Sequence, residues 1–135
     1  MRFNGVIQRK LALLDSQVCQ LEQTLRDVSY GDFSTNWGLR CIAERALQVS
    51  IEIVIDIAER IIAMEGAGPV STAAEAIERL ERMKIIGSRT PYVEMIRFRN
   101  VIVHQYEEID SAILFDLAKN RLSDFRRFRD EIDAA

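Results

Sequence analysis

The sequence predicts an all-α protein built as an antiparallel bundle of four to five helices. Apolar residues recur at steps of three and four along most of the 135-residue chain, which gathers them on one face of each helix. Capping residues, glycines and prolines divide the chain into segments of helical length. No segment combines strict alternation of apolar and polar residues with the short length of a strand. One core is expected at this length, so residues 1–135 are predicted to form a single domain.

Apolar stripes define the first two helices. The first stripe consists of Val6, Ile7, Leu11, Leu14, Val18, Leu21 and Leu25. This helix is expected to end near Asp27, and the polar residues 29–36 predict a loop. The second and longest helix is predicted from Trp37 to Met64, because its polar residues also recur at helical spacing. These residues are Arg45, Gln48, Glu52, Asp56 and Glu59.

Helix-breaking and helix-capping residues predict where the remaining helices begin and end. The Gly-Ala-Gly-Pro sequence at 66–69 ends the second helix, and residues 72–75 form a capping box that opens a third helix reaching about Met83. Thr-Pro at 90–91 is typical of a helix start. A fourth helix is therefore predicted from Pro91 to about Tyr106. Asp110 is suited to cap a fifth helix, which carries apolar residues as far as Phe128.

Composition excludes several classes of protein. The most apolar window, residues 49–64, contains three acidic residues and one arginine, which is too costly for a lipid-facing helix. The N-terminus lacks the apolar run of a signal peptide, so a cytoplasmic protein is expected. Cys19 and Cys41 lie in no Cys-x-x-Cys or Cys/His cluster. Buried reduced thiols are therefore expected rather than a disulfide or a zinc site.

Charge gives a local signal rather than a global one. The net charge of −3 does not favour nucleic acid overall, so any contact with RNA must come from a patch. Residues 79–99 are rich in basic side chains: Arg79, Arg82, Lys84, Arg89, Arg97 and Arg99. A solvated helix surface of mixed charge has the same composition, so this patch supports RNA binding without establishing it.

The residues best suited to chemistry lie between positions 97 and 106. They are the only histidine of the chain, His104, with Arg97, Arg99, Asn100 and Tyr106. Histidine transfers protons in both directions near neutral pH, and arginine offers a planar fork of donors that fits phosphate oxygens. Together they favour phosphoryl chemistry, although a lone histidine near a helix end more often has a structural role.

Helical geometry divides these residues between two stripes. At about 100° per residue, Arg97, Asn100 and His104 share one stripe, and Arg99 shares another with Tyr106. Arg99 and His104 are then about 140° apart, so one chain does not bring both to the same atom. Two copies related by a two-fold axis would pair these residues across a shared cleft. We therefore hypothesise a homodimer with a composite site.

Cleavage of RNA without a metal favours the same arrangement. The ribose 2′-OH attacks the adjacent phosphate, which calls for a base on the attacking oxygen and an acid on the leaving 5′-oxygen. One chain has one imidazole, whereas a symmetric dimer has two. Arg99 and Arg97 are expected to stabilise the charge that builds on the phosphate. Neither a metal nor another cofactor is expected.

The same segment resembles a known family, the HepT toxins of the HEPN (higher eukaryote and prokaryote nucleotide-binding) superfamily. The superfamily motif is Arg, four to six residues, then His, with a polar residue after the Arg, and Arg99, Asn100 and His104 match it. HepT proteins extend the motif to Arg-Asn-x-x-x-His-x-Tyr, which Tyr106 completes. Further similar segments are residues 10–15, 43–48, 53–58 and 124–128. The likeness covers nearly the whole chain.

The resemblance implies a dimeric HEPN-type bundle that acts as an endoribonuclease toxin of a type VII HepT/MntA toxin–antitoxin system, cutting RNA such as tRNA. It implies catalytic roles for Arg99 and His104. It also implies an MntA-type nucleotidyltransferase antitoxin, which silences the toxin by transferring AMP from ATP to Tyr106. Phosphates beside Arg99 would compete with RNA for its donors. The family often has glycine where this chain has Arg97, which either alters interface packing or adds a phosphate contact.

Alternatives stay open. A non-catalytic HEPN module would dock on a nucleotidyltransferase through the same groove, and a plain helical oligomerisation domain would have no active site. A metal site at Glu52 and Asp56 is disfavoured, because no Glu-x-x-His motif accompanies them and a polar stripe paired with arginines explains both. The aromatic residues Trp37, Tyr92 and Phe98 are expected in the core or an interface rather than as RNA-stacking platforms.

Overall fold

The helices fall close to the boundaries expected from the sequence. A computed structural model describes residues 3–104 and 109–135. Seven helices occur within those residues: α1 (Gly5–Leu25), α2 (Tyr30–Ser34), α3 (Trp37–Met64), α4 (Ala73–Arg82), α5 (Thr90–His104), α6 (Ser111–Asn120) and α7 (Leu122–Ala134). No strand is found in the described parts of the chain, so the predicted all-α class is confirmed.

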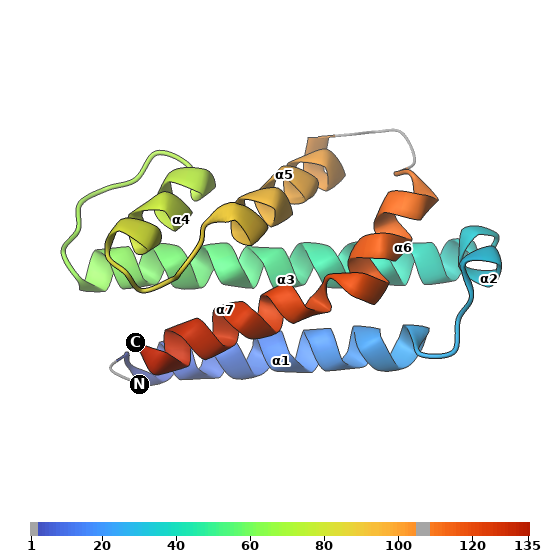
Figure 1. Ribbon diagram of the computed structural model, residues 1–135, viewed down its shortest axis with the longest axis horizontal. Helices are drawn as coiled ribbons and strands as arrows, with labels where there is room; N and C mark the ends of the chain where they lie inside the picture. The colour runs from blue at the N-terminus through green and yellow to red at the C-terminus, as the bar shows by residue number, and fades with distance from the viewer. Residues whose placement is uncertain (1–2, 105–108) are drawn as a thin grey trace.

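The longest helix, α3, forms the axis of the bundle (Figure 1). Helix α1 packs beside it in the antiparallel direction, and α7 returns along α1, so both ends of the chain lie at the same end of the molecule. Helices α4 and α5 lie along another side of α3, and α5 runs antiparallel to α3. Helix α6 packs near α2 and α3. Helix α5, which carries Arg97, Arg99, Asn100 and His104, therefore lies directly against the central helix.

A short helix, α2, occupies part of the segment that was expected to be a loop. The Ser29 hydroxyl caps it by accepting the N–H of Asp32 at 3.1 Å. Phe33 is fully buried, and its ring lies 5.1 Å from the ring of Phe115 in α6, measured between centroids. The polar composition of residues 29–36 predicts a loop, but one cap and one buried aromatic ring are enough to order this turn.

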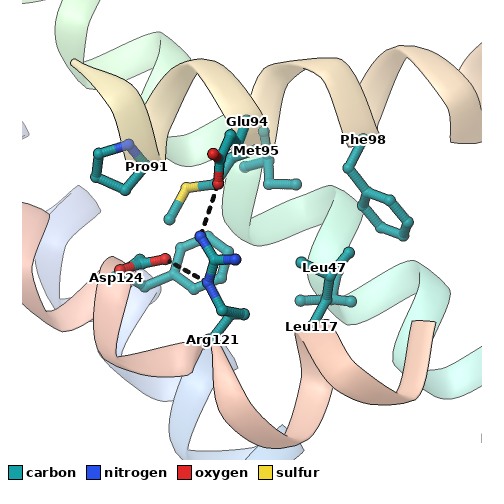
Figure 2. A pocket seen from close by; sticks show the side chains of 10 residues that line it. Leu47, Pro91, Glu94, Met95, Phe98, Leu117, Arg121 and Asp124 are labelled. Carbon is teal, nitrogen blue, oxygen red and sulfur yellow. Dashed lines mark hydrogen bonds and ion pairs between the residues drawn. The ribbon is translucent and has the colours of Figure 1, made fainter. Parts of the chain in front are cut away.

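The predicted fifth helix is instead two helices, α6 and α7, which meet at Arg121. The backbone of Arg121 leaves the helical region at φ −114° and ψ 8°. Its guanidinium binds Glu94 of α5 at 2.8 Å and Asp124 at 3.0 Å (Figure 2). The break turns α7 along α1 and buries Phe125 and Phe128. The apolar spacing also fits one continuous helix, so only tertiary packing locates the bend.

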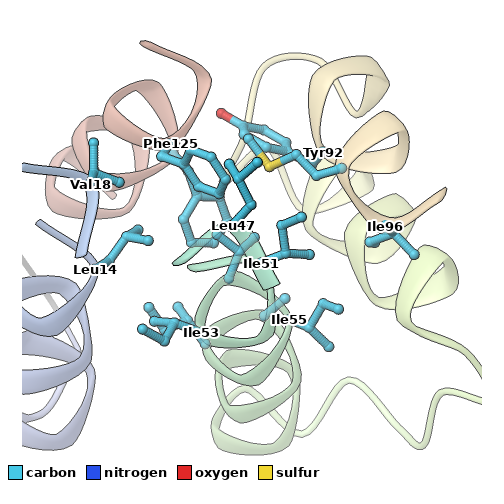
Figure 3. Packing of buried hydrophobic residues seen from close by; sticks show 14 of the residues in the cluster. Leu14, Val18, Leu47, Ile51, Ile53, Ile55, Tyr92, Ile96 and Phe125 are labelled. Carbon is cyan, nitrogen blue, oxygen red and sulfur yellow. The ribbon is translucent and has the colours of Figure 1, made fainter. Parts of the chain in front are cut away.

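The core holds α5 in place against α3 and α7. Figure 3 shows side chains that several helices contribute to it: Leu14, Val18, Leu47, Ile51, Ile96 and Phe125. The Tyr92 ring meets Phe128 edge-on, with centroids 5.2 Å apart, and the Tyr92 hydroxyl donates to the Glu131 carboxylate. Burial, reinforced by this hydrogen bond, raises the pKa of Tyr92 above its usual range. Glu131 also accepts the N–H of Gly87, so α7 fixes the loop from which α5 starts.

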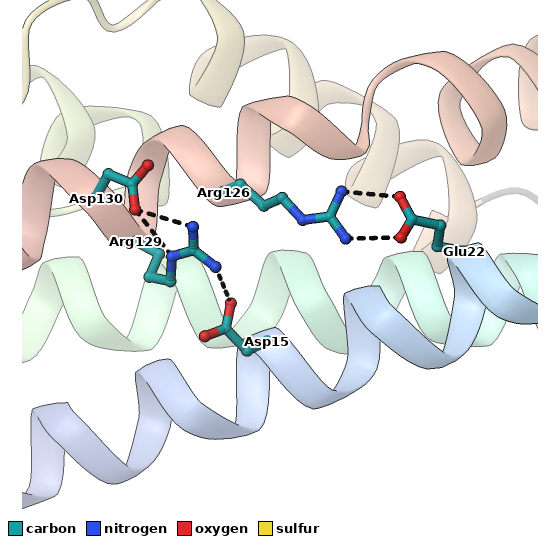
Figure 4. A network of polar contacts seen from close by, with 5 residues as sticks. All are labelled: Asp15, Glu22, Arg126, Arg129 and Asp130. Carbon is teal, nitrogen blue, oxygen red and sulfur yellow. Dashed lines mark hydrogen bonds and ion pairs between the residues drawn. The ribbon is translucent and has the colours of Figure 1, made fainter.

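Two arginines of α7 bind acidic residues of α1 (Figure 4). Both Nη atoms of Arg126 donate to the Glu22 carboxylate, at 2.9 and 3.0 Å. Arg129 binds Asp15 at 2.7 Å. The hydrogen bond from Arg126, together with its positive charge, holds the pKa of Glu22 below its ordinary value. Because the Glu22 side chain is 44% exposed, solvent screens this pair, and its contribution is expected to stay below about 1 kcal/mol.

The lowered pKa of Glu22 predicts a contribution to stability that depends on pH. A carboxylate whose pKa is lower in the folded protein stabilises the fold above its unfolded pKa and loses that contribution as the pH falls through its folded pKa. Glu22→Gln is therefore expected to be slightly less stable than the native protein at neutral pH. The difference should vanish in acid, well below the ordinary Glu22 pKa of 4.5.

Urea denaturation of both proteins at neutral and acid pH measures this difference. The control is Glu59→Gln, at an exposed position on α3, which should match the native protein at both. If the Glu22→Gln difference keeps its full size in acid, the ion pair is not its cause.

The structure also bears on the membrane and the cysteines. In the described residues, no helix is both long and apolar enough to cross a membrane. Cys19 is exposed and Cys41 is half-buried, and both are free thiols. The expectation of a buried thiol is wrong for Cys19, because it lies about 100° around α1 from the buried Val18 and so faces solvent.

Candidate active site

The buried face of α5 determines which of its residues reach solvent. Its buried residues are Pro91, Tyr92, Met95, Ile96 and Phe98. These side chains anchor the first part of the helix, and the opposite face is open. Helix α5 reaches His104. The end predicted at Tyr106, and Tyr106 itself, lie outside the described residues.

Arg97, Asn100 and His104 are all exposed. They follow one another at spacings of three and four residues, so they share one stripe of α5, as predicted. Within residues 3–104 and 109–135, none of them has a hydrogen-bond or ion-pair partner. An arginine, an amide and an imidazole therefore face solvent side by side, which suits a ligand with anionic oxygens.

Arg99 lies on a different face of α5, turned toward α3. Its side chain is only 22% exposed, and its Nη1 donates to Glu52 Oε1 at 3.3 Å. The Nε of Arg99 is buried and has no acceptor within the described parts of the chain. Its low exposure and its pairing with Glu52 keep the Arg99 guanidinium against α3.

One chain thus brings three of the four described site residues together and keeps the fourth apart. The stripe of Arg97, Asn100 and His104 faces outward, whereas Arg99 faces Glu52. This separation of Arg99 from the other three residues agrees with the two stripes predicted from helical geometry. The sequence predicts only a polar stripe for Glu52 and does not predict its contact with Arg99, because 47 residues separate the two and no local pattern links them.

Uncovered apolar side chains lie near this stripe. Val101 and Val103, which follow Asn100 on α5, are 40% and 47% exposed. Trp37, the first residue of α3, is 72% exposed, so it is not part of the core. Tyr92 and Phe98 are buried, as expected.

The basic residues between positions 79 and 99 do not form one open patch. Three of them bind carboxylates of this chain: Arg79 binds Glu75, Arg89 binds Glu78 and Glu81, and Arg99 binds Glu52. Arg82, Lys84 and Arg97 remain exposed. Much of this segment is therefore the mixed-charge surface that the sequence left open as an alternative.

A cavity lies between α3, α5, α6 and α7, away from the predicted site (Figure 2). Its lining is mostly apolar, and its charged lining residues, Arg121, Glu94 and Asp124, are paired with one another. None of the described site candidates, Arg97, Arg99, Asn100 and His104, lines it. Within the described residues, no three His, Cys, Asp or Glu side chains gather as metal ligands would. Glu52 and Asp56 instead bind Arg99 and Lys10, respectively, as the polar-stripe interpretation predicts.

Known proteins resemble this chain in sequence and in fold. Residues 14–132 match a family model described as "Ribonuclease HepT-like". A curated mRNA nuclease HepT from Shewanella oneidensis is 26% identical over 133 residues, which cover 97% of this chain and 98% of that protein. A curated tRNA nuclease HepT from Aphanizomenon flos-aquae is 27% identical over 117 residues, which cover 82% of this chain and 76% of that protein.

A solved structure has the same fold. It is described as a tri-AMPylated Shewanella oneidensis HEPN toxin in complex with an MNT antitoxin. The TM-score is 0.90 at 26% sequence identity, and the match covers 98% of this chain and 100% of the solved chain.

Proposed function

Because this chain belongs to the ribonuclease HepT-like family, we propose that it is a metal-independent endoribonuclease toxin of a HepT/MntA toxin–antitoxin system, which cleaves RNA at a site shared by two copies of the chain. The observation that carries this proposal is the exposed stripe of Arg97, Asn100 and His104 on α5, whose side chains have no partner among the described residues, with Arg99 on another face of the helix. Residues 1–135 act as one HepT-like domain in the cytoplasm.

The proposed reaction needs two proton transfers. One His104 takes the proton of the ribose 2′-OH as its oxygen attacks the adjacent phosphorus. His104 of the partner subunit gives a proton to the 5′-oxygen as its bond to phosphorus breaks. The products are a 2′,3′-cyclic phosphate and a free 5′-OH. Arg99 is assigned to the phosphoryl oxygens, where negative charge builds in the transition state. Asn100 and Arg97 are assigned to hold the backbone of the RNA beside the scissile bond.

The surface around the stripe supports a dimer. A phosphodiester reaches two imidazoles only if two α5 helices meet near their C-terminal ends. Val101 and Val103 of α5 leave apolar surface uncovered on either side of the stripe, and burial of this surface between two copies is favourable. A two-fold interface presents the same patch from both subunits, so the same contacts that join the chains also pair their stripes.

The comparisons support the substrate class and the partner. One relative is called an mRNA nuclease and another a tRNA nuclease, so RNA is proposed as the substrate, with tRNA among the targets. A structural relative is an AMPylated toxin bound to an MNT antitoxin. We extend this to an MntA-type nucleotidyltransferase that transfers AMP to Tyr106 of this chain.

Mixed dimers test the composite site. Native chains and His104→Ala chains are refolded together in varied ratios, and cleavage of a labelled RNA is measured with and without a chelator. If one site needs both histidines, activity follows the square of the native fraction, so an equal mixture retains about one quarter of the native rate. The chelator should leave the rate unchanged, and the product should carry a cyclic phosphate.

Other outcomes would contradict the composite site or the nuclease function itself. A rate that falls in direct proportion to the native fraction means that each chain works with its own histidine. A stable monomer with full activity has the same meaning. Absence of cleavage from native protein that still binds a nucleotidyltransferase favours the non-catalytic HEPN module.

A further inference from the structure

We propose that Glu52 of α3 is a positioning residue for RNA cleavage and acts by holding the Arg99 guanidinium in its working orientation. The inference rests on the proposed function, which assigns Arg99 to the phosphate. It adds a residue that lies outside the sequence motif, 47 positions before Arg99. The juxtaposition of these two residues comes only from the packing of α5 against α3.

The burial of Arg99 is the first step of the argument. A long cationic side chain at a helix surface normally extends so that water reaches its charged end. The Arg99 side chain is instead 22% exposed, and its Nε is shielded without an acceptor in the described residues. Glu52 is the one described residue that pairs with this guanidinium. The Glu52 carboxylate therefore keeps the Arg99 side chain from extending into water.

The second step is the support behind Glu52. Its neighbours Ile51 and Ile53 are buried, at 2% and 8% exposure, and α3 is the central helix of the bundle. The backbone that carries the carboxylate is thus fixed. A guanidinium that is placed in advance needs no reorganisation when charge builds on the phosphate, whereas a mobile one must be ordered in each turnover.

The third step is that Glu52 leaves Arg99 able to bind a substrate. It makes one contact, to Nη1 at 3.3 Å, rather than a two-pronged pair. In the described residues Nη2 has no partner, so donors remain for phosphoryl oxygens. The Glu52 side chain is 45% exposed, and solvent screening keeps its repulsion of RNA small.

A competing role is that Glu52 occupies Arg99 in place of RNA. Both roles predict somewhat tighter RNA binding when the carboxylate is removed, because a negative charge is lost. They differ in kcat, which falls if Glu52 positions Arg99 and is unchanged or higher if Glu52 only competes. The chemical rate therefore separates them.

The experiment compares kcat and KM of Glu52→Ala and Glu52→Gln with the native protein. Glu52→Ala is expected to lower kcat about 10- to 100-fold without raising KM. Glu52→Gln keeps an oxygen that accepts the Nη1 hydrogen bond, so its kcat should lie between those of the native and alanine proteins. The matched control is Asp56→Ala, which removes the same charge one turn along α3, where Asp56 binds Lys10 and Arg60. Its kcat should remain native.

A second measurement does not depend on activity. The Nε–H proton of Arg99 exchanges slowly with water while it is shielded, and NMR follows it directly. Glu52→Ala should speed this exchange at least tenfold, whereas Asp56→Ala should not. The same spectra report whether each variant is folded.

The outcomes separate this inference from the proposed function. A native kcat in Glu52→Ala, with an inactive His104→Ala protein, overturns the role of Glu52 and leaves the nuclease standing. If native protein cleaves no RNA, the proposed function fails, and the catalytic role of Glu52 fails with it. Unchanged exchange of the Arg99 proton in Glu52→Ala also overturns the proposal.

Discussion

Replacing His104 with alanine is expected to lower kcat for RNA cleavage by about 10²–10⁴-fold, the usual contribution of a general acid or base. His104 carries the only imidazole of the chain. In a symmetric dimer one substitution removes both proton-transfer groups from each shared site. KM should change little, because the positive charges of Arg97 and Arg99 remain to bind RNA.

Because His104 is exposed, this substitution tests the chemistry separately from the stability of the fold. It is the last described residue of α5 and has no described partner, so its removal should not disturb the core. The matched control is Asn120→Ala, at the exposed last residue of α6, which should retain native activity. Circular dichroism checks that both variants keep the helical fold. A His104→Ala protein that cleaves within a few-fold of the native rate excludes the imidazole from the chemistry.

The second large expected effect is silencing of the nuclease by modification of Tyr106. When the protein is produced together with an MntA-type nucleotidyltransferase and ATP, its intact mass should increase by one or more AMP groups. Ribonuclease activity should then fall to background. Each AMP brings a negatively charged phosphate to a residue two positions after His104, where it is expected to compete with RNA for the donors of Arg99. Tyr106→Phe should retain its unmodified mass and its activity under the same conditions.

A matched tyrosine is available as the control. Tyr30 is 45% exposed and lies on α2, so Tyr30→Phe should still gain AMP and still be silenced. Tyr92 is fully buried and is not a suitable comparison. If the added mass persists in Tyr106→Phe, the modification is on another residue. If Tyr106 is modified but cleavage continues, AMP transfer does not act by blocking the site.

Local sequence patterns alone predicted helix bounds, the family and the face of α5 that carries the polar stripe. The bounds of α3 agree with the predicted Trp37 and Met64. A long apolar stripe whose polar residues also recur at helical spacing fits one regular structure, an α-helix. The motif at residues 97–106 indicated the HepT branch of the HEPN superfamily, and the family match confirms it. The outward stripe of Arg97, Asn100 and His104 also followed from helical periodicity alone.

Only the tertiary structure decided how the helices meet. Residues 111–134 carry one apolar period that fits a single helix, yet the chain bends at Arg121, where Glu94 of α5 and Asp124 hold the guanidinium. Phe33 orders α2 by packing on Phe115 of α6, a contact between distant segments. The pairing of Glu52 with Arg99 has the same origin. Periodicity fixes which side of a helix faces the core, but the neighbour that each side chain meets depends on how distant helices pack.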